Sequence, residues 1–257
     1  MARHTVKGMV SLIALALACS LSGSVRADDV QDNKAIVDKA IKALGGEEAL
    51  GKVKAASWKS KTTITFNGSD NQGTTVSTVD GLDHFRQEFE GEFNGNKFKG
   101  VTLLAGDKGS RKFGDNTTEL DKEAVANEKR TVYLTMIPIT LLALKDKEFK
   151  MEAVPEEKVS DKPAAGIKVT APDKKDFTLF FDKESGLPIK MVAKVVGFQP
   201  GDEYTQETTF SDYKEMAGIK KAAKVASKRN GEKFMTQEIT EFKLLDKVDP
   251  KTFTAVE

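Results

Sequence analysis

The sequence is poor in the residues that most often carry out catalysis or bind metals. It has one cysteine, Cys19, and two histidines, of which only His84 lies beyond the first few residues. We therefore expect no thiolate or histidine metal site and no cofactor. Positive charge is not in excess either, because 40 Lys and Arg residues face 39 Asp and Glu residues. This balance predicts that the protein has no nucleic-acid partner.

The first 27 residues differ in character from the rest of the chain. Arg3 and Lys7 form a basic start, and residues 9–21 form an almost uncharged apolar run that is too short for a membrane-spanning helix. Val25-Arg26-Ala27 then fits the cleavage pattern of a secretory signal peptide. We predict cleavage after Ala27 and export to the periplasm or cell envelope. A lipid anchor at Cys19 is the alternative, although the residues before it match a lipoprotein signal poorly.

Residues 28–257 form the expected mature chain, which contains no cysteine and so no disulfide. A composition of 39% hydrophobic and 31% charged residues suits a single globular domain with one core. Apolar residues recur at roughly helical spacing up to Leu44, and Gly45-Gly46 follow as a stop signal. We predict a helix there, followed by a second short helical turn at 47–53.

From Trp58 onward the apolar spacing changes from helical to alternating. Residues 58–66 place Trp58, Ser60, Thr62, Ile64 and Phe66 on one face of a strand. Asn67-Gly68 follows as a signal for a tight hairpin turn, and Asn94-Gly95 and Asn230-Gly231 repeat it. No βαβ rhythm and no glycine-rich phosphate loop is present. The pattern predicts an antiparallel meander of about ten strands.

The stretch FFDKESGLPIK, residues 180–190, could hold a catalytic carboxylate pair or a turn. Apolar residues alternate into the stretch and out of it, so it connects two strands. Asp182 and Gly186 are typical turn residues, and Pro188 suits the first position of a strand. We interpret the stretch as a hairpin turn and not as a catalytic site.

Residues 121–144 do not follow the meander. Asp121 is a suitable N-cap for a helix, and residues 136–144 are dense in apolar side chains around Pro138. Since proline interrupts helices, we predict a helix, a kink at Pro138 and a second short helix across the concave side of a curved sheet. These residues could complete a solid core, or they could form a movable lid over an apolar cavity.

Several segments, in this order along the chain, resemble the bacterial lipoprotein-carrier family of LolA/LolB-like proteins. They are ALGGEEALGKVKA, FRQEF, MIPITLLAL, FDKESGLPIK and FSDYKEMAGIKKAAKV. The resemblance implies a mainly β fold, in which a strongly curved antiparallel sheet forms an incomplete β-barrel covered by a few helices. It also implies an apolar cavity that takes the acyl chains of a lipid or lipoprotein.

Family members are carriers and not enzymes, so the resemblance implies an exported envelope carrier or chaperone. We expect a monomer that meets a membrane-bound donor or acceptor protein. Two alternatives stay open, namely a binding or sensor module with the same fold and a hydrolase of unknown type. A Ser-His-Asp triad would have to use His84, where a solvated histidine is expected.

The resemblance also suggests which residues would meet the ligand. They come from the early strands and from the 121–144 segment: Trp58, Ile64, Phe66, Phe85, Phe89, Met136, Ile137, Leu141 and Leu142. Arg86 resembles the arginine with which the family's carriers hold the lid shut. Arg86 alternates with Phe85 and Phe89 along the strand, so its side chain points outward if theirs point inward. A surface arginine is therefore the other interpretation.

Overall fold

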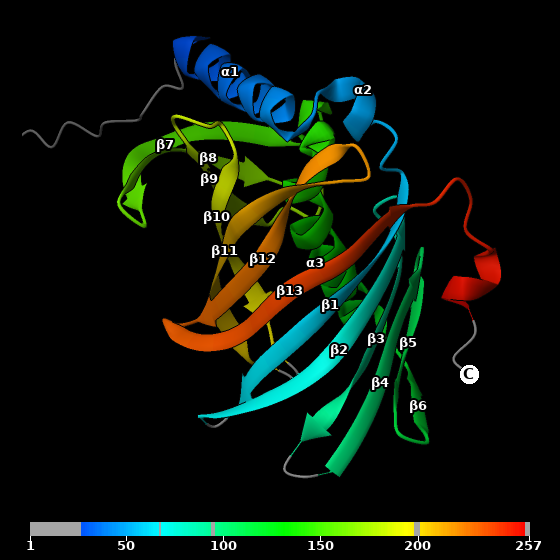
Figure 1. Cartoon of the computed structure of the whole chain (residues 1–257). Helices are drawn as coiled ribbons and strands as arrows, with labels where there is room; N and C mark the ends of the chain where they lie inside the picture. Colours follow the sequence, from blue (N-terminus) through cyan, green and yellow to red (C-terminus); the bar gives the residue numbers. More distant parts are fainter. Residues whose placement is uncertain (1–26, 67, 94–95, 198–200, 255–257) are drawn as a thin grey trace, which may run out of the picture.

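The structure is a computed structural model that describes residues 27–66, 68–93, 96–197 and 201–254 (Figure 1). All of the proposed signal segment except Ala27, and with it Cys19, lies outside the described residues. Within the described ranges the helical elements are α1 (Ala27–Leu44), α2 (Glu47–Leu50), α3 (Lys122–Thr140), η1 (Leu142–Lys145) and η2 (Pro250–Phe253). The strands are β1 (Ala55–Phe66), β2 (Ser69–Asp80), β3 (His84–Phe93), β4 (Asn96–Ala105), β5 (Lys108–Phe113), β6 (Asn116–Glu119), β7 (Lys150–Val159), β8 (Lys162–Thr170), β9 (Asp176–Asp182), β10 (Pro188–Val196), β11 (Glu203–Met216), β12 (Ile219–Arg229) and β13 (Glu232–Leu244).

The strands of the described residues form one open antiparallel sheet of 13 strands, in the order β6-β5-β4-β3-β2-β1-β13-β12-β11-β10-β9-β8-β7. Two meanders, β1–β6 and β7–β13, are joined where β1 pairs with β13. The predicted mainly β class and antiparallel sheet are confirmed. The predicted number of about ten strands was too low. One reason is β6, whose four residues are all exposed and so show no apolar alternation.

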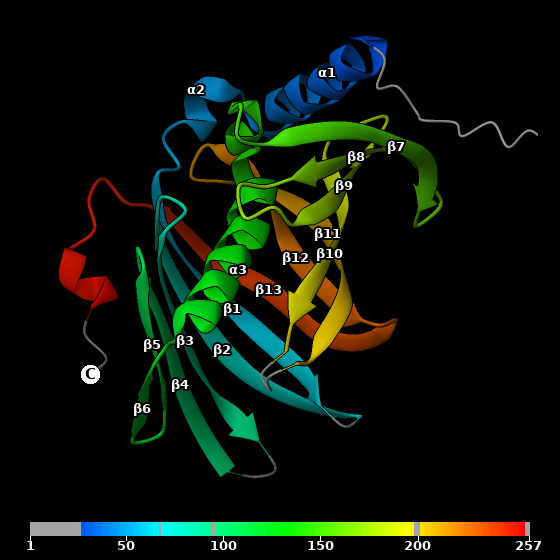
Figure 2. The ribbon, with the colours of Figure 1, turned by 180° about the vertical axis from the view of Figure 1, so that it is seen from behind.

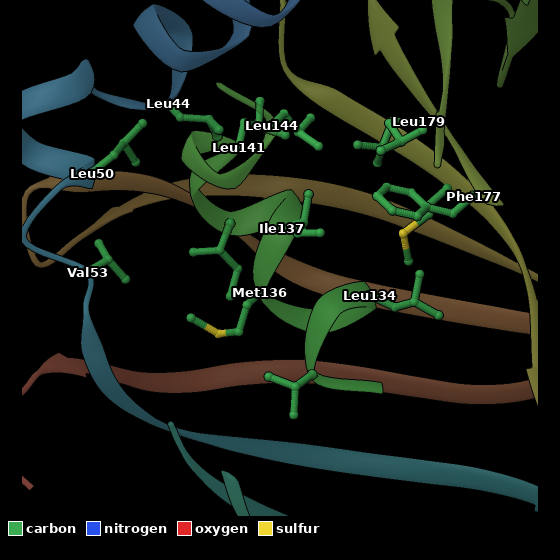
Figure 3. Packing of buried hydrophobic residues seen from close by; sticks show 14 of the residues in the cluster. Leu44, Leu50, Val53, Leu134, Met136, Ile137, Leu141, Leu144, Phe177 and Leu179 are labelled. Carbon is green, nitrogen blue, oxygen red and sulfur yellow. The ribbon is translucent and has the colours of Figure 1, made fainter. Parts of the chain in front are cut away.

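The sheet curves around α3, which connects the two edge strands and crosses the concave side (Figures 1 and 2). Helices α1 and α2 cover one end of the sheet, which we call the helix-covered end. The main core lies there and joins Leu44 and Leu50 to Ile137, Leu141 and Leu144 (Figure 3). None of the helices in the described ranges has the length and apolar character needed to cross a bilayer.

The turns follow the local sequence signals where they are described. Asn230 and Gly231 have φ angles of 49° and 86° and join Arg229 to its partner Glu232, as a two-residue hairpin turn requires. Asn67 and the Asn94-Gly95 pair lie outside the described residues.

The 180–190 stretch forms the predicted turn between β9 and β10. Asp182 Oδ1 accepts hydrogen bonds from the backbone N–H groups of Glu184 and Ser185 at 2.9 and 2.8 Å. Asp182 is nevertheless buried, with 4% exposure, whereas Glu184 is exposed. The two carboxylates therefore have different surroundings and do not form a pair with shared chemistry.

Helix α3 begins as predicted but ends later. Asp121 caps its N-terminus by accepting a hydrogen bond from Ala124 N at 2.8 Å. The helix continues through Pro138 to Thr140 and ends at Leu141, which has a φ of 59°. The chain therefore stays helical through Pro138, where we predicted a kink, and the predicted second short helix follows as η1 after Leu141. In the last turn, proline removes one backbone hydrogen bond, and burial of Ile137 and Ile139 holds the helical path.

A cavity beneath helix α3 is the candidate functional site

A cavity of about 830 Å³ lies between α3 and the concave side of the sheet. This volume is within the range of about 300–1,000 Å³ that is typical of small-molecule sites. Helix α3 contributes Leu134, Pro138 and Ile139 to its wall, and strands on opposite sides contribute Phe85 and Met191. The curved sheet and the helix that spans its edges therefore enclose a space large enough for a ligand.

The wall of this cavity is not purely apolar. Ser77 and Gln87 line it from β2 and β3, with Gln87 Nε2 donating to Ser77 Oγ at 3.4 Å. Thr208 and Ser227 line it from β11 and β12, with their hydroxyl oxygens 3.1 Å apart. These hydroxyl and amide groups have partners in the protein, so they can face a ligand without requiring one. The wall suits an amphipathic molecule better than a pure hydrocarbon.

The structure separates the predicted ligand residues into distinct groups. Trp58, Ile64 and Phe85 line the cavity. Phe89 is half-buried, its ring centroid lies 5.8 Å from that of Phe98, and it does not line the cavity. Phe66 is 54% exposed at the end of β1 and does not line the cavity either.

The predicted lid residues lie in the core and not on the cavity wall. Met136, Ile137 and Leu141 are at most 4% exposed and belong to the main core (Figure 3). Leu142, in η1, is half-buried and packs against that core. In this conformation the face of α3 that meets the cavity is instead formed by neighbouring positions, including Leu134, Thr135 and Pro138. Sequence alone could not decide which face of the helix points inward.

Arg86, the predicted latch residue, is half-buried on β3 and contacts a neighbouring carboxylate and the C-terminal segment. Its Nε donates to Glu88 Oε1 at 2.6 Å, and its Nη1 donates to the carbonyl of Thr252 at 3.1 Å. Arg86 thus connects β3 to the C-terminal segment around η2, as its outward alternation with Phe85 predicted. The two contacts join Arg86 to Glu88 of its own strand and to the segment around η2.

Other charged residues attach the first half of α3 to both sides of the sheet. Glu128 forms an ion pair with Arg111 of β5, and Lys129 Nζ lies 2.6 Å from Asp107 Oδ1. On the other side, Arg130 donates to the carbonyls of Lys175 and Asp176. These residues were not predicted from the sequence. Their signal was a run of three consecutive charged residues within the predicted helix.

Arg130 is buried, with 4% exposure. Burial lowers its pKa, and the nearby carboxylates of Asp173 and Asp176 act in the opposite direction. Its Nη1 lies 3.4 Å from Asp173 Oδ2, and its guanidinium lies over the ring of Phe177. Only its Nε is enclosed without a partner. Arg130 is therefore a largely satisfied structural cation at the edge of the cavity.

Lys221 of β12 is a second buried cation, and it also lines the cavity. It is 6% exposed, and its Nζ lies 5.3 Å from the ring centroid of Trp58 and 5.2 Å from that of Phe242. Burial lowers the pKa of Lys221 to about 8. The inward position of Lys221 could not be predicted from the sequence. Lys220 and Lys221 are adjacent, and only the strand register decides which of the two side chains points inward.

His84 shows no arrangement for nucleophilic catalysis. Its Nδ1 lies 2.9 Å from Asp83 Oδ1, and its partly exposed ring contacts Phe253 edge to face. Across the described ranges, no group of three or more His, Cys, Asp and Glu side chains is placed to hold a metal ion.

Comparison with known proteins gives similarity in structure only. No protein-family model matches the sequence, and no curated protein matches it. A LolA superfamily protein from Nitrosomonas europaea is 10% identical with a TM-score of 0.56, and the alignment covers 87% of this chain and 97% of that protein. A putative outer membrane lipoprotein-sorting protein domain from Vibrio parahaemolyticus is 10% identical with a TM-score of 0.51, covering 88% and 94%. A DUF1329 family protein from Desulfovibrio piger is 13% identical with a TM-score of 0.52, covering 86% and 96%.

These alignments cover most of this chain and most of each similar protein, so the similarity extends over the whole domain and is not limited to a shared hairpin. At such low identity it establishes the arrangement of the chain and leaves the ligand open. The open, curved antiparallel sheet with a helix across its concave side is therefore a LolA-like fold, as the sequence resemblance predicted.

Proposed function

We propose that this protein is an exported envelope carrier that binds the acyl part of a lipid or lipoprotein in the cavity beneath α3. The observation that carries the proposal is the cavity itself, about 830 Å³ between the helix and the concave sheet. An acyl chain gains about 0.8 kcal/mol for each CH₂ group that leaves water. A protein that moves such a chain through an aqueous compartment needs an enclosure of this kind.

The proposed mechanism is binding, followed by release to a membrane-bound acceptor protein. Helix α3 would act as the cover, and its two halves differ in how they are fixed. The second half packs in the core through Met136 and Ile137, whereas the first half is attached through ion pairs such as Lys129 with Asp107. We propose that the first half moves when the ligand enters or leaves, which requires the exposed Lys129–Asp107 pair to open and Glu128 and Arg130 to leave their partners.

The similar solved structures support this proposal only through their fold. One of them is described as a putative outer membrane lipoprotein-sorting protein domain. Export after cleavage at Ala27 and monomeric action remain parts of the proposal that depend on the sequence.

The first test is the ligand content of the protein isolated from the cell envelope. Native mass spectrometry with extraction of the bound material should detect one lipid or lipoprotein acyl group per chain. A fluorescent fatty-acid probe should bind the purified protein, and the native ligand should displace it.

A matched pair of variants connects that binding to the cavity. Thr135 lies on the cavity wall, whereas Lys122 lies exposed at the start of the same helix and does not line the cavity. Thr135→Trp should block probe binding by filling the space, and Lys122→Trp should leave it unchanged. Equal binding by both folded variants, or no bound lipid in the native protein, would rule out this cavity as the carrier site.

A further inference from the structure

Lys221 is a buried cation for which the described residues provide no counter-ion. Its Nζ contacts the faces of the Trp58 and Phe242 rings, which stabilise a cation only in part. No carboxylate or carbonyl of the described residues lies within hydrogen-bond or ion-pair distance of it. A buried charge without a partner carries a large desolvation cost, so its presence in the wall of a cavity needs an explanation.

The other buried and half-buried charged groups in the described wall of the cavity have partners. Glu128 pairs with Arg111, and Arg130 donates to two backbone carbonyls. Arg229, at the opposite end of β12 from Lys221, donates to Gln206 Oε1 at 3.1 Å and lies 3.6 Å from the ring centroid of Phe234. Lys221 is therefore distinguished by having neither a hydrogen-bond acceptor nor an anion.

The ammonium group of Lys221 reaches the cavity. Among the described residues, the side-chain nitrogens and oxygens that are fully enclosed without a partner are Asn33 Oδ1 and Arg130 Nε. Lys221 Nζ also lacks a partner but is not one of these enclosed atoms, so it retains contact with the open space that it lines. It comes near the start of β12, which lies beside Gly45 at the helix-covered end.

We propose that Lys221 binds the acidic head group of an amphipathic ligand, which enters the cavity with its head group toward the helix-covered end. This inference rests on the proposed carrier function and specifies the ligand as an anionic amphiphile. A single unpaired ammonium matches a carboxylate, which carries one negative charge. Ile64, Val195 and Phe234 line the cavity at the strand ends opposite the helix-covered end and can contact the chain.

The test compares ligands that share a chain and differ in the head group. Titration calorimetry of the full chain, freed of lipid, would use dodecanoic acid, dodecyl phosphate and dodecyl alcohol. The wild type should bind dodecanoic acid most tightly. Lys221→Met should weaken that binding by about ten- to a hundredfold and leave binding of the alcohol unchanged. Lys221→Arg should retain most of the preference for the acid.

Two matched controls locate the effect. Lys224→Met removes an exposed charge from the same strand and should change the affinity neither for dodecanoic acid nor for dodecyl alcohol. Arg229→Met removes a cation of the cavity wall from the opposite end of the same strand and should affect the acid much less than Lys221→Met does. A preference for the acid that depends on Arg229 and not on Lys221 would overturn the assignment.

The outcomes also separate this inference from the proposed function. Equal binding of acid and alcohol by the wild type would overturn the role of Lys221 while leaving a lipid carrier in place. Tighter binding of dodecyl phosphate than of dodecanoic acid would overturn the carboxylate assignment. Failure of all three ligands to bind the wild type would overturn both the inference and the carrier proposal.

Discussion

Two regions of the molecule each bury one cation, and the two cations differ in their polar partners. One region is the contact of α3 with the β8–β9 turn, and the other is the helix-covered end of the cavity. Arg130 is 4% exposed and has backbone carbonyls and Asp173 as partners. Lys221 is 6% exposed and has only aromatic faces. Two cations that are buried to the same extent can therefore have different roles. A satisfied charge fixes the structure, whereas an unsatisfied one in a cavity wall is available to a ligand.

Replacing Arg130 should produce the largest effect. Arg130→Met leaves the carbonyls of Lys175 and Asp176 without their donor, and we expect a loss of about 3–5 kcal/mol in the free energy of unfolding. Urea denaturation would measure it. Lys129→Met, next in sequence, breaks only an exposed ion pair and should cost less than about 1 kcal/mol. Similar losses for the two variants would contradict the structural role of Arg130.

The apolar core near η1 gives a reference for packing without charge. Leu141 is fully buried and Leu142 is half-buried. Leu141→Ala should cost about 2–4 kcal/mol of stability and Leu142→Ala less, with probe binding retained in both folded variants. If either substitution changed lipid occupancy while leaving thermal unfolding unaltered, these residues would belong to a movable lid after all.

Replacing Lys221 should have the opposite sign to replacing Arg130. Lys221→Met removes an uncompensated buried charge, so in the absence of ligand it should stabilise the protein by about 1–3 kcal/mol near neutral pH. Thermal unfolding of the protein freed of lipid would measure the change. A strong loss of stability would show that the two aromatic rings are sufficient partners for the ammonium group.

The pH dependence of the Lys221→Met effect has a definite direction. The pKa of Lys221 is about 8 in the folded protein and 10.5 as the reference value. Below the folded value, the lysine is charged in both states and its burial lowers stability. As the pH rises from about 8 toward 10.5, the folded protein has released a proton that the unfolded chain still holds, and the penalty disappears. The stability difference between Lys221→Met and wild type should therefore shrink across that range.

Asp182 extends the comparison to a buried anion that has partners, and its replacement should have the smallest effect. The backbone N–H of Ser185 is the main cause that lowers the pKa of Asp182. Asp182→Ala should lower the free energy of unfolding by about 1–2 kcal/mol. Glu184→Ala, at an exposed position, should change it by less than about 0.5 kcal/mol. The stability that Asp182 contributes should be fully present at a pH above the ordinary carboxyl pKa. It should be lost as the pH falls through the pKa of Asp182 in the folded protein. Urea denaturation at neutral and acidic pH would test both statements.

The sequence predicted the elements that depend on neighbours along the chain. The N-cap at Asp121 and the two-residue turn at Asn230-Gly231 both formed, because a cap or a turn requires only local hydrogen bonds and φ angles. The end of α3 was predicted less well. Pro138 is a local signal to stop, but the burial of Ile137 and Ile139 outweighed it.

The sequence by itself determined an antiparallel meander interrupted by one helical segment, because alternation and turn residues encode strands directly. Only the tertiary structure decided which side chains meet the cavity. Met136 and Ile137 entered the core while Leu134 and Pro138 faced the cavity, and Lys221 turned inward beside its exposed neighbour Lys220. Such choices depend on helix rotation and strand register, which are set by packing between segments far apart in the chain.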